Sequence, residues 1–79
     1  MEGKFNDSLI GKAVKYYDFL DAERFGHIVA IEPYPMDPEQ AYIYIEDNDS
    51  EYNIHQDFIN GKIIRYAELR PSSEVYIDE

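Results

Sequence analysis

The fold of this chain is decided by the segment Ala41-Tyr42-Ile43-Tyr44-Ile45-Glu46, in which tyrosine and isoleucine alternate without interruption. Successive side chains of a β-strand point to opposite faces, so this alternation predicts a strand with tyrosines on one face and isoleucines on the other. The next residues, Asp47-Asn48-Asp49-Ser50, favour a turn because such side chains bond their own backbone. We therefore expect residues 51–55 to return as the second arm of a hairpin.

Further β-strands are expected on both sides of residues 41–46, because β-branched and aromatic side chains recur in short runs. Pro33 ends one of these runs, and with Pro35 and Pro38 it predicts a proline loop that cannot be a central strand. The expected elements are strands at 13–19, 26–32, 41–46, 51–55 and 62–69, a long first loop at 19–25, one helical turn at 56–61, and residues 74–78 as a sixth strand at an edge or folded over one end. The chain is thus predicted to be all-β.

This order of elements resembles an SH3-like small barrel over about residues 10–70. Tyr16-Tyr17-Asp18-Phe19 is similar to the Ala-Leu-Tyr-Asp-Tyr motif of SH3 domains. The resemblance implies a closed barrel of five to six strands, with one short helical turn before the fifth strand and no exposed sheet edges. Residues 1–9 are expected to be flexible and residues 10–79 to form this single SH3-like β domain. SH3 domains bind proline-rich peptides over a tryptophan, and this chain has none, so the barrel does not imply that function.

Acidity is the most unusual feature of the composition. Seventeen Asp and Glu residues against seven Lys and Arg residues give a net charge of −10. Residues 16–61 carry eleven of the acids and a single base, Arg24, so the excess lies in the middle of the chain. Such a field repels DNA, RNA and anionic lipid and attracts basic partners, while solubility is the alternative explanation of the same charge. We expect a basic protein partner, with no direct nucleic acid and no membrane.

Other features of the sequence exclude most kinds of chemistry. Cysteine is absent, and no apolar run approaches the roughly 20 residues of a membrane span. Residues 1–7 are polar and mixed in charge, unlike a secretory signal, so a cytoplasmic protein is expected. The serines fall in turns or tails, and His27 and His55 stand apart in the sequence, so no catalytic residue is assigned.

A calcium loop is the one metal site that the sequence suggests. Residues 47–51 place oxygen-bearing side chains at the spacing with which an EF-hand loop opens. The sixth position, which needs glycine, is Tyr52, and the twelfth, which needs glutamate, is Phe58. We therefore expect no metal, no cofactor and no enzyme activity.

The remaining carboxylates are grouped in three predicted loops. In an SH3-like barrel the first long loop and the proline loop flank one surface, the hairpin tip projects at the far end, and alternating strands present tyrosines between them. The predicted partner-binding residues are Asp18, Asp21 and Glu23 of the first loop, Asp37 and Glu39 of the proline loop, Glu46, Asp47, Asp49 and Glu51 of the hairpin, and Tyr42 and Tyr44.

Carboxylates at this density are similar to the charge array of duplex DNA, which carries one negative charge per about 1.7 Å of axis. In size, charge and tyrosine content the chain resembles the DNA-mimic inhibitors found in bacteriophages. That resemblance implies a non-catalytic inhibitor that occupies the nucleic-acid-binding surface of a basic protein, such as the nucleoid protein HU or a DNA-processing enzyme. A homodimer paired through residues 75–77 would extend the array. The alternative is an SH3-like adaptor that binds a protein or peptide, its charge serving only solubility.

Overall fold

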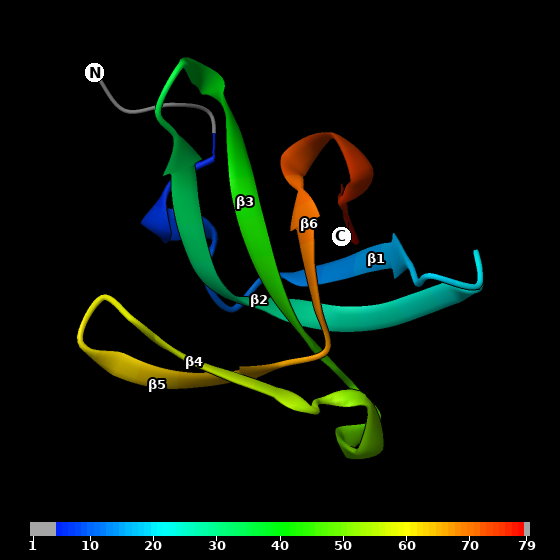
Figure 1. The fold of residues 1–79 in the computed structure, drawn as a ribbon. Helices are drawn as coiled ribbons and strands as arrows, with labels where there is room; N and C mark the ends of the chain where they lie inside the picture. Colours follow the sequence, from blue (N-terminus) through cyan, green and yellow to red (C-terminus); the bar gives the residue numbers. More distant parts are fainter. Residues whose placement is uncertain (1–4, 79) are drawn as a thin grey trace.

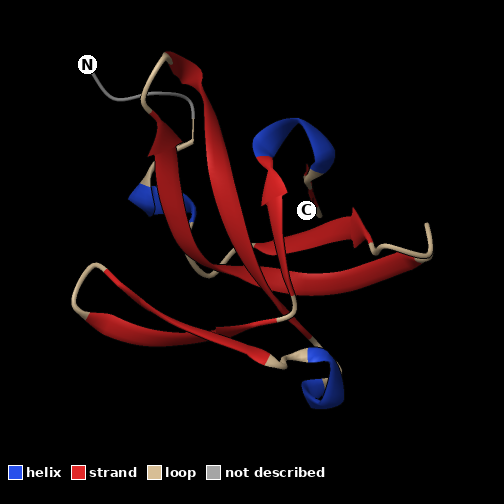
Figure 2. Ribbon diagram, viewed as in Figure 1, coloured by secondary structure: helices blue, strands red, loops and turns tan. Residues whose placement is uncertain are grey.

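The computed structural model describes residues 5–78, and β-strands make up most of them (Figure 1). Figure 2 shows that the helical segments of this part of the chain are short turns. Each has three residues in the 3-10 conformation. The strands are β1 Ala13–Tyr17, β2 Glu23–Tyr34, β3 Asp37–Asp47, β4 His55–Ile59, β5 Lys62–Tyr66, β6 Glu68–Pro71 and β7 Tyr76–Ile77, and the 3-10 turns are η1 Asp7–Leu9, η2 Ser50–Tyr52 and η3 Ser72–Glu74. The prediction of an all-β protein is confirmed.

The strands form two antiparallel sheets and no closed barrel. Five strands pair in the order β6-β3-β2-β1-β7, and β4 pairs with β5 in a separate two-stranded sheet. β2 and β3, of twelve and eleven residues, are the longest strands and pair with each other within the large sheet (Figure 1). A barrel needs one continuous ladder of hydrogen bonds, whereas here the chain leaves the large sheet after β3 and the end strands β6 and β7 are not paired with each other. The predicted closure of the strands into a barrel is therefore wrong.

The segment after β3 differs most from the prediction. η2 lies where a return strand was expected, and β4 lies where a helical turn before the fifth strand was expected. β4 and β5 meet at Asn60-Gly61, whose φ angles of 51° and 81° suit a two-residue hairpin turn. We interpreted Gly61 as the end of a helical turn, but Asn-Gly between two apolar runs is a hairpin signal.

The β2–β3 hairpin extends through the proline segment. β2 continues past Pro33 to Tyr34 and β3 begins at Asp37, so that only Pro35 and Met36 form the turn between them. The expected proline loop is therefore mostly strand. Proline has no backbone N–H to donate, and the register of the two strands shifts between Pro33 and Tyr34, so the pairing of the strands is irregular at this proline.

Both ends of the described chain lie against the large sheet. β7 pairs with β1 at the sheet edge, which was one of the two arrangements expected for the C-terminal segment. Of residues 1–9, which were expected to be flexible, residues 1–4 lie outside the described residues. Phe5 and Leu9, the last residue of η1, pack against the core.

Two apolar clusters lie on opposite faces of β2 and β3. The larger contains Val14, Tyr16, Ile28, Ile31, Ala41, Ile43, Ile45 and Val75, and the smaller contains Ala30, Tyr44 and Tyr66. The alternation along β3 separates Ile43 and Ile45 from Tyr44, whose ring packs edge-on against Tyr66 of β5 with 4.9 Å between centroids. Burial of the larger cluster stabilises the five-stranded sheet, and the smaller cluster holds the β4–β5 hairpin on its other face.

Candidate functional site

Asp47, at the end of β3, is a buried carboxylate that joins three segments of the chain. It accepts hydrogen bonds from the Tyr16 hydroxyl and from Nε and Nη2 of Arg24, which lie 3.1 and 2.9 Å away. Its backbone N–H donates to Oδ1 of Asn53 at 2.7 Å, and the Arg24 guanidinium lies 3.7 Å from the centre of the Tyr52 ring. A buried charge needs such partners because an isolated one is strongly unfavourable. The cluster therefore fixes η2 against β1 and β2.

The pKa values of this cluster follow from its contacts. Burial raises the pKa of Tyr16, and the hydrogen bond to Asp47 raises it further, so the hydroxyl stays protonated and donates. Burial also raises the pKa of Asp47, but the hydrogen bonds from Arg24, Tyr16 and the backbone N–H of Asp49 act in the opposite direction and outweigh it. The pKa of Asp47 is thus held below its ordinary value of 3.8. The carboxylate is charged at neutral pH and serves as a structural acceptor.

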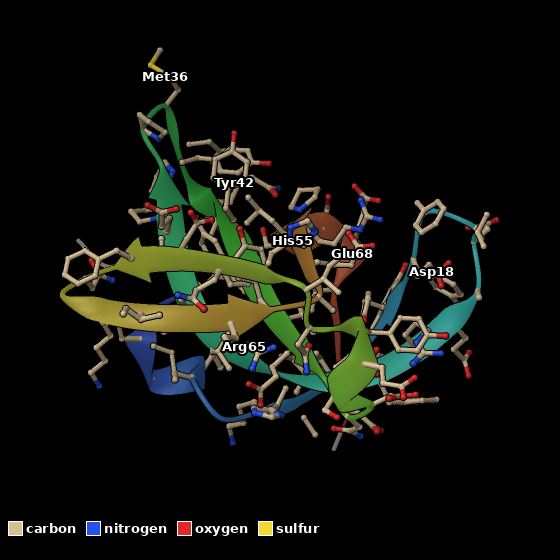
Figure 3. All side chains as sticks on the ribbon, turned by 60° about the horizontal axis from the view of Figure 1, so that its bottom comes forward. Asp18, Met36, Tyr42, His55, Arg65 and Glu68 are labelled. Atoms are coloured by element: carbon tan, nitrogen blue, oxygen red, sulfur yellow. The ribbon has the colours of Figure 1, made fainter. Side chains whose placement is uncertain are left out.

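Because η2 is fixed in this way, it lies beside the loop between β1 and β2, and a groove of about 240 Å³ separates them. In Figure 3, Asp18 lies on the loop at one side of this region, with His55 and Glu68 on the other side. The groove is lined by Tyr16, Asp18, Phe19, Glu51, Tyr52, Ile54, His55, Ala67 and Glu68. Residues from three separate stretches of the chain thus share one surface.

The apolar part of the groove is open to solvent. Phe19 is 82% exposed and Ile54 is 77% exposed. A single exposed apolar side chain is ordinary, but these two line the same groove from different segments, together with the half-exposed ring of Tyr52. The groove can therefore receive an apolar side chain of a partner.

Carboxylates form the rim of the groove. Oδ1 of Asp18 accepts two backbone N–H groups of its own loop, at 2.9 and 3.0 Å, which holds the loop in shape. Glu68 lies 3.3 Å from the Arg70 guanidinium. Glu51 forms no ion pair with any cationic side chain of residues 5–78, and its backbone N–H is capped by Asp49 at 3.1 Å. Cationic side chains of a partner would find acceptors on this rim.

A shallow depression next to the groove is lined by two more of the predicted site residues. Glu23 and Asp49 both line it, beside Arg24. Glu23 also lies 3.8 Å from the Lys15 ammonium group. Asp21 is in the same loop, with a φ angle of 64°, a left-handed conformation that aspartate tolerates. The first loop and the segment after β3 are therefore the two acidic segments that the fold brings together.

The proline segment lies elsewhere. Asp37 and Glu39 are at the tip of the β2–β3 hairpin, where the Asp37 carboxylate accepts the Glu39 backbone N–H at 2.9 Å. Figure 3 shows Met36 at this tip, far from Asp18. We predicted that the first loop and the proline loop flank one surface, with the 46–51 segment at the far end. This arrangement is wrong, because the missing barrel closure leaves β2 and β3 as a long arm.

The other predicted site residues differ in their exposure. Tyr44 and Asp47 are buried, so neither presents its side chain to a partner. Glu46 is half-buried and its Oε1 lies 3.1 Å from Nε2 of His27. Tyr42 is exposed, and its ring packs against Tyr34 with 4.4 Å between centroids. Of this group, Tyr42 is the most accessible.

Several residues of the candidate site were not predicted. Phe19 and Ile54 are large apolar residues near acids, and only that pattern could have indicated them. Glu68 lies outside the clusters of acids along the chain. Next to the groove, the Tyr66 hydroxyl donates to the Asp57 carboxylate. That hydrogen bond, with burial, raises the pKa of Tyr66 to about 12.

Two further observations concern residues 5–78. No helix in this range is long and apolar enough to cross a membrane. The same residues contain no group of three or more His, Asp and Glu side chains that could hold a metal ion. Comparison of the chain with protein-family models, with curated proteins and with solved structures finds no match.

Proposed function

We propose that this protein is a non-catalytic binding protein that holds a basic segment of another protein in its acidic groove. The convergence of the first loop and η2 around exposed apolar side chains carries this proposal. A partner with Lys or Arg next to apolar residues would place cations near Asp18, Glu51 and Glu68, and apolar groups against Phe19 and Ile54. The net charge of −10 would speed the encounter with such a partner.

The test uses a synthetic peptide of about ten residues in which Lys and Val alternate. Its affinity is measured by isothermal titration calorimetry for two double variants that remove the same two charges, Asp18→Asn with Glu51→Gln in the groove and Asp37→Asn with Glu39→Gln at the hairpin tip. We expect the groove variant to bind about fivefold more weakly, because exposed charge pairs contribute roughly 0.2–1 kcal/mol each. The hairpin-tip variant should change by less than about twofold.

Equal weakening in the two double variants would contradict the groove as the site, since the peptide would then respond to net charge alone. Failure of the wild-type protein to bind the peptide at low salt would contradict the proposed function itself. Binding should also weaken when salt rises from about 0.05 M to about 0.5 M, because exposed charges are then screened.

Mimicry of duplex DNA is a second candidate with separate support. The longest extent of the molecule is 36 Å, similar to one turn of duplex DNA at about 34–36 Å. Carboxylates lie beside the groove, at Glu23 and Asp49, and also at the hairpin tip, at Asp37 and Glu39. Only four ion pairs join two side chains within residues 5–78, and of the carboxylates named here only Glu23 takes part in one of them.

Mimicry predicts displacement of DNA from a basic nucleic-acid-binding protein. The protein is titrated into a complex of HU with fluorescently labelled duplex DNA, and the anisotropy of the DNA is followed. We expect the anisotropy to fall to that of free DNA, because both molecules would occupy the same cationic surface. Unchanged anisotropy at about tenfold excess of the protein over HU would count against mimicry of the DNA that HU binds.

A further inference from the structure

The β4 strand has an open edge. Within residues 5–78 it pairs with β5 alone, and β5 is the strand of this hairpin that contacts β2 and β3. The free edges of the large sheet are protected in other ways, since β7 has two residues and β6 ends at Pro71. β4 has five residues and contains neither lysine nor proline, the residues that usually block an edge.

The register of the hairpin shows which backbone groups face this edge. Ile59 and Lys62 flank the two-residue turn and pair directly, so they form the hydrogen-bonded pair next to it. In an antiparallel ladder such pairs alternate with pairs that are not hydrogen-bonded. The N–H and C=O groups of Phe58 and Gln56 therefore point away from β5, toward the open edge.

The two faces of β4 differ in chemistry. Asp57 and His55 face the large sheet, where Asp57 accepts the Tyr66 hydroxyl and the His55 ring packs on Tyr66 with 5.4 Å between centroids. On the outer face, Phe58 is 71% exposed and its cross-strand partner Ile63 is 65% exposed. The inner face thus presents Asp57 and aromatic rings beside the apolar Ile59 and Ile64, and Phe58 and Ile63 make the outer face largely apolar.

Charge decides which kind of strand fits this edge. Glu32 of β2 adds a second carboxylate on the side of the inner face. It accepts a hydrogen bond from the hydroxyl of Tyr44, whose ring packs against Tyr66. On the outer face Arg65 lies opposite Gln56 and disfavours a cation there. A second copy of this chain would bring its own Asp57 and a net charge of −10 to the same edge. A basic segment meets no such net repulsion, and the cation on the inner face of the hairpin, Lys62, lies at its turn, opposite Ile59.

The open edge is continuous with the acidic groove, because His55, the first residue of β4, and Ile54 both line that groove. We propose that the basic segment binds as an added β-strand on β4, with basic side chains on the inner face and apolar side chains on the outer face. Strand addition supplies affinity through backbone hydrogen bonds and specificity through alternate side chains. This inference rests on the proposed function and adds the partner's pattern, an alternation of basic and apolar residues.

The experiment compares the alternating Lys-Val peptide with a peptide of identical composition in which all Lys residues precede all Val residues. Strand addition predicts that the alternating peptide binds about tenfold more tightly, because only it can place every cation on one face. Hydrogen exchange followed by NMR should show slower exchange of the Gln56 and Phe58 amides in the complex. Equal affinities, or unprotected amides, would overturn strand addition.

Gln56→Pro removes one outward N–H, and proline is tolerated where the N–H faces solvent, so the free protein should remain folded. Its matched control is Gln56→Ala, which keeps the N–H. We expect the Gln56→Pro variant to bind the alternating peptide about tenfold more weakly than the wild-type protein. The Gln56→Ala variant should bind it less than about twofold more weakly. If the proline variant is folded and binds normally while the groove double variant is weakened, strand addition fails and the proposed function stands. If the wild-type protein binds neither peptide, both fail.

Discussion

Replacement of Asp47 by alanine should lower the free energy of unfolding by about 3–5 kcal/mol, as expected when one partner of a buried ion pair is removed. The Asp47 side chain is 2% exposed, and its loss leaves the Tyr16 hydroxyl and the Arg24 guanidinium without their acceptor. A domain of this size has a stability of roughly 4–12 kcal/mol, so the variant should be close to unfolding. Urea unfolding at pH 7, followed by circular dichroism, measures the change.

The control for this prediction is Asp49→Ala, which removes an exposed carboxylate two residues away that caps the Glu51 N–H. It should lose about 1 kcal/mol. The difference between wild type and Asp47→Ala should also depend on pH. The folded pKa of Asp47 is lowered from 3.8, so its contribution is complete above about pH 4 and is lost as the pH falls through the folded value. A difference that is as large at about pH 2 as at neutral pH would contradict the role of the charged pair.

Replacement of Gly26 by alanine should lower the free energy of unfolding by about 2–3 kcal/mol. A Cβ atom on Gly26 would lie 2.2 Å from the backbone oxygen of Glu46, and a backbone atom cannot rotate away as a flexible side chain can. Gly26 pairs with Val14 of β1 on one side and with Asp47 of β3 on the other, so the substitution should separate strands at the centre of the sheet. Thermal unfolding measures the loss.

Gly11→Ala separates this steric effect from the ordinary effect of replacing glycine. Nothing lies within 4 Å of a Cβ atom at Gly11, but its φ angle of 95° is unfavourable for alanine. Backbone strain alone should therefore destabilise this variant by about 1–2 kcal/mol. If Gly26→Ala were no less stable than Gly11→Ala, close packing of β2 on β3 would not be the reason for glycine at position 26.

Both positions also bear on binding, since Asp47 fixes η2 and Gly26 allows β2 to approach β3. A variant that loosens the Asp47 cluster should widen the groove before the whole domain unfolds, because none of the residues of η2 is buried. The charge variants of the proposed site are therefore placed at exposed positions such as Glu51, where loss of binding does not reflect loss of the fold.

The strand at residues 41–46 could be predicted because its evidence is local. Alternation of Tyr42, Ile43, Tyr44 and Ile45 requires no knowledge of the rest of the chain, and burial of the isoleucines on one face follows from it. The turn at Asn60-Gly61 is equally local, but the predicted helical turn ending at Gly61 takes no account of the Asn-Gly pair. That error moved β4 out of the predicted strands.

The candidate site was predicted less well than the strands. The sequence indicated that carboxylates cluster near residues 18–23 and 46–51, and both segments belong to the site. It did not indicate that Asp47 turns inward to Arg24, because an acid in a turn and an acid in a buried pair have the same local context. Nor did it indicate that Glu68 joins the groove, because that depends on the path of β5 into β6.

The strand content thus follows from the periodicity of short segments, and the acidity and the absence of cysteine follow from composition. None of these properties depends on contacts between distant parts of the chain. The partners of each strand depended on contacts distant in sequence: Tyr44 with Tyr66 placed the β4–β5 hairpin, and Arg24 with Asp47 placed η2. These contacts turned the expected barrel into an open sheet with an added hairpin. They also separated the carboxylates that are buried from those, such as Asp18 and Glu51, that are available to a partner.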